Sequence, residues 1–504
     1  MGASKSPFPS FPRGWFVIGF SPDIAPGDVK TLHYFGQDIV VFRTASGVLS
    51  AVDRTCPHLG AHLGVGKVDG ECLRCPYHAW GYDATGRCVD IPYAAKIPPK
   101  AAVRAWPLRE VNGCILVWHC PRGEAPTWEP PVLEEEGWTP NQTVRWELSG
   151  YVQDVAENTV DTAHLWPVHH VGPAEVRGLE QQGHYMHVVL RMTASGAPVE
   201  MPDETHEVEL DVTVHGLGMV VSSTHVLNAD LRTRQRIYPV PIDETKIAIF
   251  GVNNTMKMAD PAYTKEIDDI FYRAFLVDFP RDFPIWSTKA YVDRPLLAAG
   301  DGPIAKYRKW CRQFYEWPAE AQPQAVKPQA APEPEGLLGR LTRAARKLRD
   351  LAQKPAAPSP ASGRPAGRPT DDDEQELVAP RPQHTEAPAA QHGRFASVES
   401  YFDTIEARFD REAAGDLEAV FQWVLTGDHG REHFVEIRGG RAQSTAGHHP
   451  APTLTIEMSA ADYLMMINGE LNGARAFSTG RGKLRGPVRL AMKMQRLFPL
   501  ERAV

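Results

Sequence analysis

Two short runs of cysteine and histidine near the N-terminal end constrain this chain most strongly. Cys56 and His58 form a C-x-H motif, and after sixteen intervening residues Cys75 and His78 form a C-x-x-H motif. Two thiolates and two imidazoles in two tight loops suit a [2Fe–2S] cluster in which histidines replace two cysteines on one iron. The same four side chains also suit a tetrahedral zinc ion, which is the alternative.

The residues beside these ligands favour the cluster. Pro57 and Pro76 follow the two cysteines, and each fixes φ and removes an amide donor where the loop turns over the metal. Gly60 permits close backbone approach, and the indole of Trp80 stands where it can shield a bound cluster. The pattern resembles a Rieske domain, and the resemblance implies a one-electron relay.

The resemblance also separates two kinds of Rieske domain. Respiratory members carry an extra cysteine in each loop, which together form a disulfide, and a Ser or Tyr hydroxyl that donates to sulfur. Ala61 and Tyr77 occupy the positions that match the extra cysteines. We therefore expect neither the cross-link nor the donors, and a lower reduction potential, as in clusters that supply an oxygenase.

A second metal motif follows about a hundred residues later. Asp161, His164 and His169 form D-x-x-H-x4-H. We expect Asp161 and His164 to share one face of a helix that Pro167 ends, so that His169 turns back to the same metal. Two histidines and a distant carboxylate form the facial triad of non-haem Fe(II) oxygenases, with open positions for O₂. A structural histidine pair is the alternative, and the adjacent His170 competes with His169 as the ligand.

The two motifs in this order resemble the terminal oxygenase component of Rieske non-haem iron oxygenases. The resemblance covers residues 10–317 and is narrowed by four later segments: Asp282–Trp286, Asp293–Pro295, Asp301–Pro303 and Arg308–Tyr315. These segments are similar to the steroid-acting branch, which includes the 3-ketosteroid 9α-hydroxylase oxygenase component and cholesterol 7-desaturase.

The resemblance implies several residue roles. Asp282 becomes the carboxylate ligand of the mononuclear iron, with Asp278 as the fallback. Asp161 becomes a bridge between His164 and the cluster ligand His78 of a neighbouring subunit in a homotrimer. The alternative is that Asp161 only orients His164 within its own chain.

Asn158 stands just before this motif. It helps to hold the metal helix, or it is an ordinary polar surface residue.

The composition predicts a multidomain α+β chain. We expect a β-rich Rieske domain over 10–120. For 121–317 the family resemblance implies a catalytic domain of the helix-grip, START-like fold. Residues 318–393 are rich in Pro, Ala, Gln and charge and read as a disordered linker. Within this linker, 336–352 forms a basic amphipathic helix that suits a membrane surface or a protein partner. Residues 394–504 form a separate α/β domain.

The separate C-terminal domain has its own pattern. We expect a helix over 402–409, strands over 434–437 and 454–458, and a helix over 460–467 capped by Ser459. The run from Thr455 to Gly486 resembles a sterol carrier protein 2 (SCP2) domain, which implies a bound lipid. Five methionines offer a soft apolar lining, with ordinary core packing as the alternative for each. They are Met458, Met465, Met466, Met492 and Met494.

Charge and cysteine usage limit the partners and the compartment. The net charge is −8 and no basic stripe crosses the folded parts, which argues against nucleic acid. Five cysteines remain beyond the cluster ligands, an odd and scattered set that indicates free thiols in a reducing, cytoplasmic compartment. No apolar run approaches the ~20 residues of a membrane span, so membrane association would have to come from the 336–352 helix.

The combined patterns predict a Rieske monooxygenase or desaturase that acts on a sterol or steroid. It would use O₂, a [2Fe–2S] cluster, mononuclear Fe(II) and electrons from an NAD(P)H-dependent ferredoxin-type reductase. Hydroxylation, 7-desaturation and oxidation of a C-4 methyl group all fit this chemistry. The alternatives are a non-enzymatic lipid-binding electron carrier and an oxygenase for another hydrophobic substrate.

Overall fold

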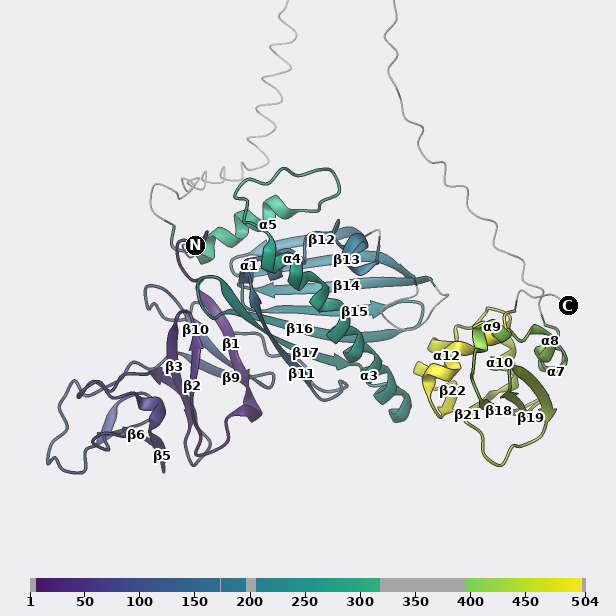
Figure 1. Ribbon diagram of the computed structural model, residues 1–504, viewed down its shortest axis with the longest axis horizontal. Helices are drawn as coiled ribbons and strands as arrows, with labels where there is room; N and C mark the ends of the chain where they lie inside the picture. The colour runs from purple at the N-terminus through teal and green to yellow at the C-terminus, as the bar shows by residue number, and fades with distance from the viewer. Residues whose placement is uncertain (1–5, 173, 196–204, 318–394, 501–504) are drawn as a thin grey trace, which may run out of the picture. The chain divides into compact units, whose positions relative to one another are not determined.

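The computed structural model describes residues 6–172, 174–195, 205–317 and 395–500. These residues form a β-rich N-terminal region, a central region built on one large sheet, and a smaller C-terminal region (Figure 1). The predicted multidomain α+β class is confirmed. The predicted linker and its helix over 336–352 lie outside the described residues.

Short strands make up the N-terminal region. They are β1 (Gly14–Phe20), β2 (Val29–Tyr34), β3 (Gln37–Arg43), β4 (Leu49–Asp53), β5 (Lys67–Asp69), β6 (Cys72–Arg74), β7 (Gly81–Tyr82), β8 (Cys88–Asp90), β9 (Leu108–Val111) and β10 (Cys114–His119). Their sheets have the orders β1-β10-β9, β2-β3-β4 and β5-β6-β7-β8. The predicted cluster loops follow β4 and β6.

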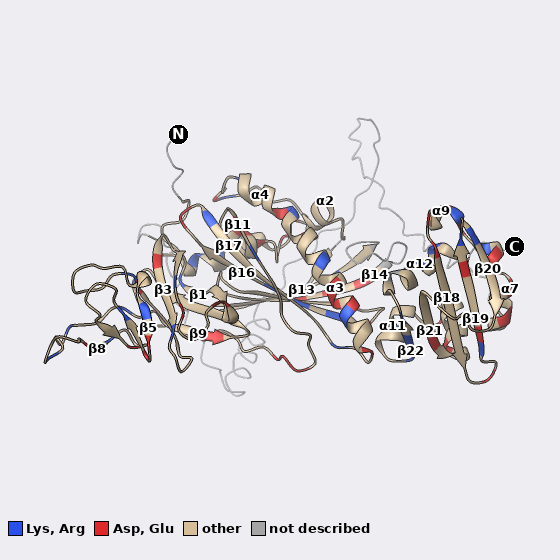
Figure 2. Ribbon diagram, turned by 60° about the horizontal axis from the view of Figure 1, so that its bottom comes forward, with Lys and Arg blue, Asp and Glu red and all other residues tan. Residues whose placement is uncertain are grey.

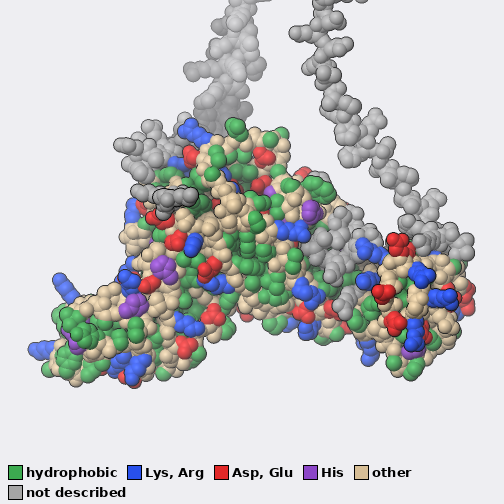
Figure 3. Space-filling model, in the orientation of Figure 1, with side chains coloured by type: hydrophobic (Ala, Val, Ile, Leu, Met, Phe, Trp, Pro, Cys, Tyr) green, Lys and Arg blue, Asp and Glu red, His purple; other side chains and the backbone are tan. Residues whose placement is uncertain are grey.

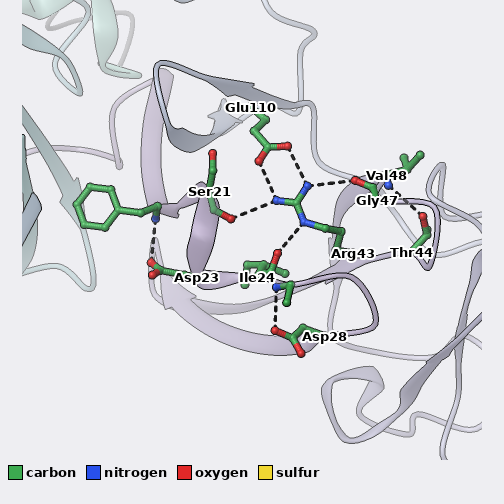
Figure 4. Close-up of polar contacts among 11 residues, drawn as sticks. Ser21, Asp23, Ile24, Asp28, Arg43, Thr44, Gly47, Val48 and Glu110 are labelled. Atoms are coloured by element: carbon green, nitrogen blue, oxygen red, sulfur yellow. Dashed lines mark hydrogen bonds and ion pairs between the residues drawn. The ribbon is translucent and has the colours of Figure 1, made fainter. Parts of the chain in front are cut away.

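Arg43 joins two of these sheets. Its side chain forms a bidentate pair with Glu110 on β9, with Nη2 2.8 Å and Nη1 3.0 Å from the two carboxylate oxygens. Its Nε donates to the backbone oxygen of Ile24 at 2.6 Å (Figure 4). Because a guanidinium presents its donors in a rigid plane, one side chain fixes β3 against β9 and the η1 turn (Ser21–Asp23).

One antiparallel sheet dominates the central region. Its strands are β11 (Gln142–Ser149), β12 (Ala174–Gln182), β13 (Tyr185–Ser195), β14 (Thr205–His215), β15 (Val220–Val226), β16 (Leu231–Pro241) and β17 (Lys246–Thr255). The order across the sheet is β11-β17-β16-β15-β14-β13-β12. β11 lies at one edge of the sheet, beside β17. The strands from β12 to β17 lie side by side in chain order, as hairpin connections require.

A long helix, α3 (Pro261–Asp278), packs on one face of this sheet. It begins at the cap residue Asp260, whose carboxylate accepts from the backbone N–H of Ala262 at 2.8 Å. Its buried stripe consists of Tyr263, Thr264, Ile267, Asp268, Ile270, Phe271 and Phe275. Charged residues lie at several other positions along the helix (Figure 2).

Several shorter helices surround α3. They are α1 (Val152–Glu157), α2 (Leu165–His169), η3 (Phe279–Asp282), α4 (Phe283–Thr288), α5 (Ile304–Cys311) and η4 (Arg312–Phe314). Hydrophobic side chains gather on the surface over α3 and α4, where Val277 and Ile285 are exposed (Figure 3).

The predicted helix through the second metal motif is wrong. α1 ends at Glu157, and Asp161 lies in the loop that leads to α2. Pro167 does not end a helix but lies inside the first turn of α2, where a missing N–H costs no intrahelical hydrogen bond. The helix ends instead at His170, which adopts the left-handed conformation at φ 58°. The turn between α1 and α2, rather than one helical face, therefore places the metal motif.

The C-terminal region is a five-stranded sheet with helices, counted over the described residues. Its elements are α7 (Val398–Asp403), α8 (Ile405–Arg408), α9 (Arg411–Ala414), β18 (Ala419–Thr426), β19 (Arg431–Arg438), β20 (Arg441–Ala446), β21 (Leu454–Ser459), α10 (Ala460–Ile467), α11 (Gly473–Ser478), β22 (Gly482–Arg485) and α12 (Val488–Leu497). The sheet order is β20-β19-β18-β21-β22, with β18 parallel to β21.

One of two predicted features of this region is confirmed, and the other is wrong. Ser459 does cap α10, because its hydroxyl accepts from the N–H of Asp462 at 3.0 Å. The single helix predicted over 402–409 is wrong, since the chain breaks at Thr404 into α7 and α8. The Thr404 hydroxyl donates to the carbonyls of Tyr401 and Ser400 instead, a local bond that competes with helix continuation.

Candidate functional site

The two cysteine–histidine loops have the same local geometry. In each, the backbone oxygen of the cysteine accepts from the N–H four residues later: Gly60 to Cys56 at 3.0 Å and Ala79 to Cys75 at 3.1 Å. Gly60 and Ala79 both have positive φ, at 77° and 60°. Each loop therefore folds back sharply after its Cys-Pro pair, which presents the thiol and the following imidazole on one side.

The four predicted ligands converge. Cys56 and Cys75 are 2% and 3% exposed, and the ring centroids of His58 and His78 lie 4.5 Å apart. The indole of Trp80 stacks on His58 at 4.6 Å, so it shields the ligand ring as the sequence suggests. Among the described residues, buried Nδ1 of His58 has no hydrogen-bond partner. A metal ion would satisfy that nitrogen, so the residues present fit a [2Fe–2S] cluster of the mixed Cys/His type.

A sulfur donor that the sequence analysis missed also lies here. The hydroxyl of Tyr82 is 3.1 Å from Sγ of Cys56, in a fully buried position. Burial, followed by the contact with Cys56, raises the pKa of this phenol, so the hydroxyl keeps its proton. Because a cluster-bound thiolate sulfur has no proton, the hydroxyl would be the donor to it. The expected lack of hydroxyl donors is therefore wrong for this sulfur. Its position four residues after His78, on the β7 strand, was the available signal.

A second group of metal-binding side chains lies in the central region. One ligand atom each from His164, His169 and Asp282 lies within 4.8 Å of the others. Nε2 of His169 is 3.3 Å from Oδ2 of Asp282, although 113 residues separate them in the sequence. α3 makes this possible, because it carries the chain along the sheet and its C-terminal extension η3 returns Asp282 to α2.

Hydrogen bonds set the tautomer of both histidines. Nδ1 of His164 donates to the backbone oxygen of Asp161 at 2.5 Å, because a carbonyl can only accept. Nδ1 of His169 lies 3.1 Å from Oδ2 of Asp278. Each ring therefore keeps Nε2 free for a metal, and the outer partner holds the ring in place. Asp278, expected as a fallback ligand, contacts the ring nitrogen that faces away from Asp282.

The charge at the site is suited to a cation. Although burial lowers its pKa, the contacts with Asp278 and Asp282 raise the pKa of His169 to about 9. Asp282 itself is buried, with 4% of its surface exposed. Two carboxylates that favour a positive charge on His169 equally favour a metal ion bound beside it. Mononuclear iron fits this set of two imidazoles and one carboxylate.

The remaining predicted residues lie beside this group. The carboxylate of Asp161 is 3.8 Å from Nδ1 of His164, and contacts with His164 lower the pKa of Asp161 against the effect of burial. Asn158 caps the end of α1 and lines the adjacent cavity. His170 is exposed and is not part of the metal-binding group.

Ion pairs hold α1 in place under this loop. Arg308 on α5 forms a bidentate pair with Glu157, at 2.6 and 2.9 Å. Nζ of Lys289 is 2.8 Å from a carboxylate oxygen of Asp154, which is almost fully buried. Removing Lys289 would leave the buried carboxylate of Asp154 without its cation, so these pairs are expected to rigidify the segment that carries the metal motif.

A mainly apolar cavity of about 270 Å³ opens onto the metal-binding group. Its walls come from α3 and from the inward-facing residues of β13 to β16. His164, His169 and Asp282 all line it, together with Leu190, Val208, Val212, Ile237 and Phe275. A metal ion at this group would face any hydrophobic molecule bound in the cavity, and the bound molecule would exclude water from the cavity.

Comparison with known families identifies each region. The Rieske [2Fe-2S] domain matches residues 14–107, the 3-ketosteroid 9alpha-hydroxylase C-terminal domain matches 117–315, and the SCP-2 sterol transfer family matches 402–499. A probable 3-ketosteroid-9-alpha-monooxygenase oxygenase component from Rhodococcus rhodochrous is 31% identical over 63% of this chain and 83% of its own length. The cholesterol 7-desaturase of Hemicentrotus pulcherrimus is 32% identical, over 61% and 70%.

The chain belongs to the steroid branch of the Rieske oxygenases. It is thus an oxidoreductase that uses a [2Fe–2S] cluster, a mononuclear iron and O₂. The cluster prediction holds over the zinc alternative. Dicamba monooxygenase, a solved structure, shares the fold with a TM-score of 0.50 at 16% identity over 60% of this chain and 96% of its own.

The five methionines predicted to line a lipid site in this Rieske oxygenase lie in different surroundings within the C-terminal region. Met466 and Met492 line an apolar cavity, as does Met494. Met458 is buried in the core, and Met465 lies beside the guanidinium of Arg481. No helix among the described residues is both long and apolar enough to cross a membrane.

The Tyr82–Cys56 contact predicts a change in reduction potential. A hydrogen bond to a ligand sulfur stabilises the reduced cluster, so Tyr82→Phe should lower the midpoint potential by on the order of 20–60 mV. Redox titration of the cluster absorbance measures this. Tyr77→Phe is the matched control, because Tyr77 is 64% exposed. An equal shift in both variants would contradict the role of Tyr82.

The His169–Asp278 contact predicts a change in iron retention. Asp278→Asn removes the carboxylate that fixes the His169 ring and should weaken Fe(II) binding roughly 10–100-fold. Equilibrium dialysis against a chelator, with iron counted apart from the cluster, measures this. Asp269→Asn on the same helix, at an exposed pair with Lys265, should retain iron like the parent. Unchanged retention in Asp278→Asn would disprove a positioning role.

Proposed function

We propose that this Rieske oxygenase acts on a sterol or steroid and receives electrons from a separate NAD(P)H-dependent ferredoxin-type reductase. The observation that carries the proposal is the apolar cavity whose wall includes His164, His169 and Asp282. The relatives named for steroid substrates support the same substrate class, and one of them is named as an oxygenase component.

The proposed ligands divide between two centres. Cys56, His58, Cys75 and His78 hold the cluster, while His164, His169 and Asp282 hold the mononuclear iron. When bound, the cluster supplies single electrons and the mononuclear iron supplies O₂ activation. The protein binds and orients the substrate: the apolar cavity excludes water and presents an unactivated C–H bond to the metal-binding group.

Asp161 and Asn158 act as positioning residues in this proposal. The backbone and carboxylate of Asp161 both face Nδ1 of His164 and keep its proton there, so that Nε2 stays available. Asn158 ends α1 and leads the chain into this turn. A homotrimer, in which Asp161 also meets His78 of a neighbouring subunit, belongs to the same proposal.

The C-terminal region serves as a lipid carrier for the oxygenase. Its apolar cavity is lined by Met466, Met492 and Met494, which adapt to an irregular hydrophobic ligand. A tethered carrier raises the local concentration of a poorly soluble substrate, up to the millimolar range for a favourable linker. In this proposal the protein is cytoplasmic. Contact of residues 336–352 with a membrane surface would bring the lipid carrier close to the membrane that contains the lipid.

Two substitutions test the proposal through turnover. His164→Ala and Asp282→Ala should each abolish conversion of sterols, followed by mass spectrometry with a surrogate reductase, while the cluster absorbance stays at the parental level. His170→Ala is the control, because the adjacent histidine is exposed and outside the metal-binding group. The mass of the product distinguishes hydroxylation from desaturation and from methyl oxidation. Retained turnover in both alanine variants would refute the assignment.

A further inference from the structure

A band of polar side chains crosses the otherwise apolar sheet face of the catalytic cavity. In the strand register, Ser222 on β15 lies opposite Gln235 on β16, and Gln235 lies opposite Asn253 on β17. Directly opposite residues point to the same face with Cβ atoms ~5 Å apart. These three residues therefore form one polar row, which Gln142 on β11 continues.

A second polar row lies beside the first. Thr224 is opposite Thr233, and Thr233 is opposite Thr255. Ser222, Thr224, Thr233 and Gln235 all line the cavity. The neighbouring positions of the same strands, such as Val220, Val226 and Ile237, are apolar and line it too. On β15 and β16, the polar residues that line the cavity thus fall in one band of the wall.

Polar atoms in this band lack partners within the protein. Asn253 is fully buried, and neither its amide nitrogen nor its amide oxygen has a hydrogen-bond partner among the described residues. The hydroxyls of Thr233 and Thr255 are also buried and unpartnered in that part of the chain. Of these three residues Thr233 lines the cavity, and an unsatisfied buried hydroxyl in a cavity wall indicates a ligand that supplies the missing bond.

The band lies at a distance from the metal-binding group. Gln142, at the end of the first row, donates to Asp268 on α3 at 2.6 Å. Asp278, ten residues further along α3, contacts His169. Ten residues of helix correspond to about 15 Å along the axis. Gln235 and the metal-binding residues line the same cavity, so one rigid polycyclic molecule can contact both.

We propose that Gln235, which lines the cavity, recognises the oxygen substituent of the substrate, a ring ketone or hydroxyl. This inference rests on the proposed function. An amide can donate to a ketone and can accept from a hydroxyl, so Gln235 suits either oxygen. A single polar anchor in an apolar cavity fixes which carbon of the ring system faces the metal-binding group.

The test measures binding at the catalytic cavity alone, because the C-terminal region is a second lipid site. Titrations with cholest-4-en-3-one, cholesterol and oxygen-free cholest-5-ene are followed by the electron paramagnetic resonance of the nitric oxide adduct of the mononuclear iron. In Gln235→Met we expect affinity for the oxygenated probes to fall about tenfold, the effect of one hydrogen bond, with cholest-5-ene unchanged. The oxygenated probe whose affinity falls more in Gln235→Met shows whether the ketone or the hydroxyl is the preferred group.

Two further variants separate recognition from packing. Ile237→Val, on the same strand and face, should change the affinity for all three probes by one common factor. Thr233→Val removes the unpartnered hydroxyl of the same band and should not lower the melting temperature, and it should reduce the preference for oxygenated probes less than Gln235→Met does.

Equal losses for all probes in Gln235→Met, or an unchanged preference for oxygenated probes in that variant, would overturn the inference. If none of the probes perturbs the parental signal, the proposed substrate class itself fails.

Discussion

The contact of His169 with two carboxylates is the interaction on which the catalytic region depends. Asp278 holds one ring nitrogen and Asp282 faces the other, at 3.1 and 3.3 Å. The two carboxylates come from the end of α3 and from η3, whereas His169 comes from α2. The metal-binding group therefore exists only when α3 lies along the sheet, so folding of the whole central region assembles the site.

The same sheet also creates the cavity. Alternate residues of β13 to β16 point inward, and α3 covers them without filling the space between. Most inward residues are apolar, which suits a hydrophobic substrate. The polar band around Gln235 departs from this pattern at some distance from the metal-binding group. An apolar wall provides affinity, and one polar anchor provides orientation.

Local chemistry was predictable from the sequence, and long-range pairing was only partly so. The Cys-Pro loops and the Ser459 cap depend on residues within a few positions of each other. Asp282 could be assigned as a ligand only from the family resemblance, because no spacing rule connects it with His169 across 113 residues. The predicted helix through Asp161 failed because a turn satisfies the same three-residue spacing as a helix.

Other features depend on strand register and were not predicted. β7 pairs with β6 on either side of the second loop, and its Tyr82 reaches Cys56 of the first loop. Gln235, Ser222 and Asn253 are unremarkable polar residues until the register sets them in one row. Sequence alternation shows that such residues face one side of a strand, but it does not show which neighbours they meet.

The central claim is that two histidines and Asp282 hold one iron in addition to the cluster. Counting metals per chain, together with the paramagnetic signature of the reduced cluster, tests it most directly. We expect about three irons in the parent and about two in His169→Ala, with the rhombic cluster signal unchanged in both. Two irons in the parent, or zinc in place of iron, would contradict the account.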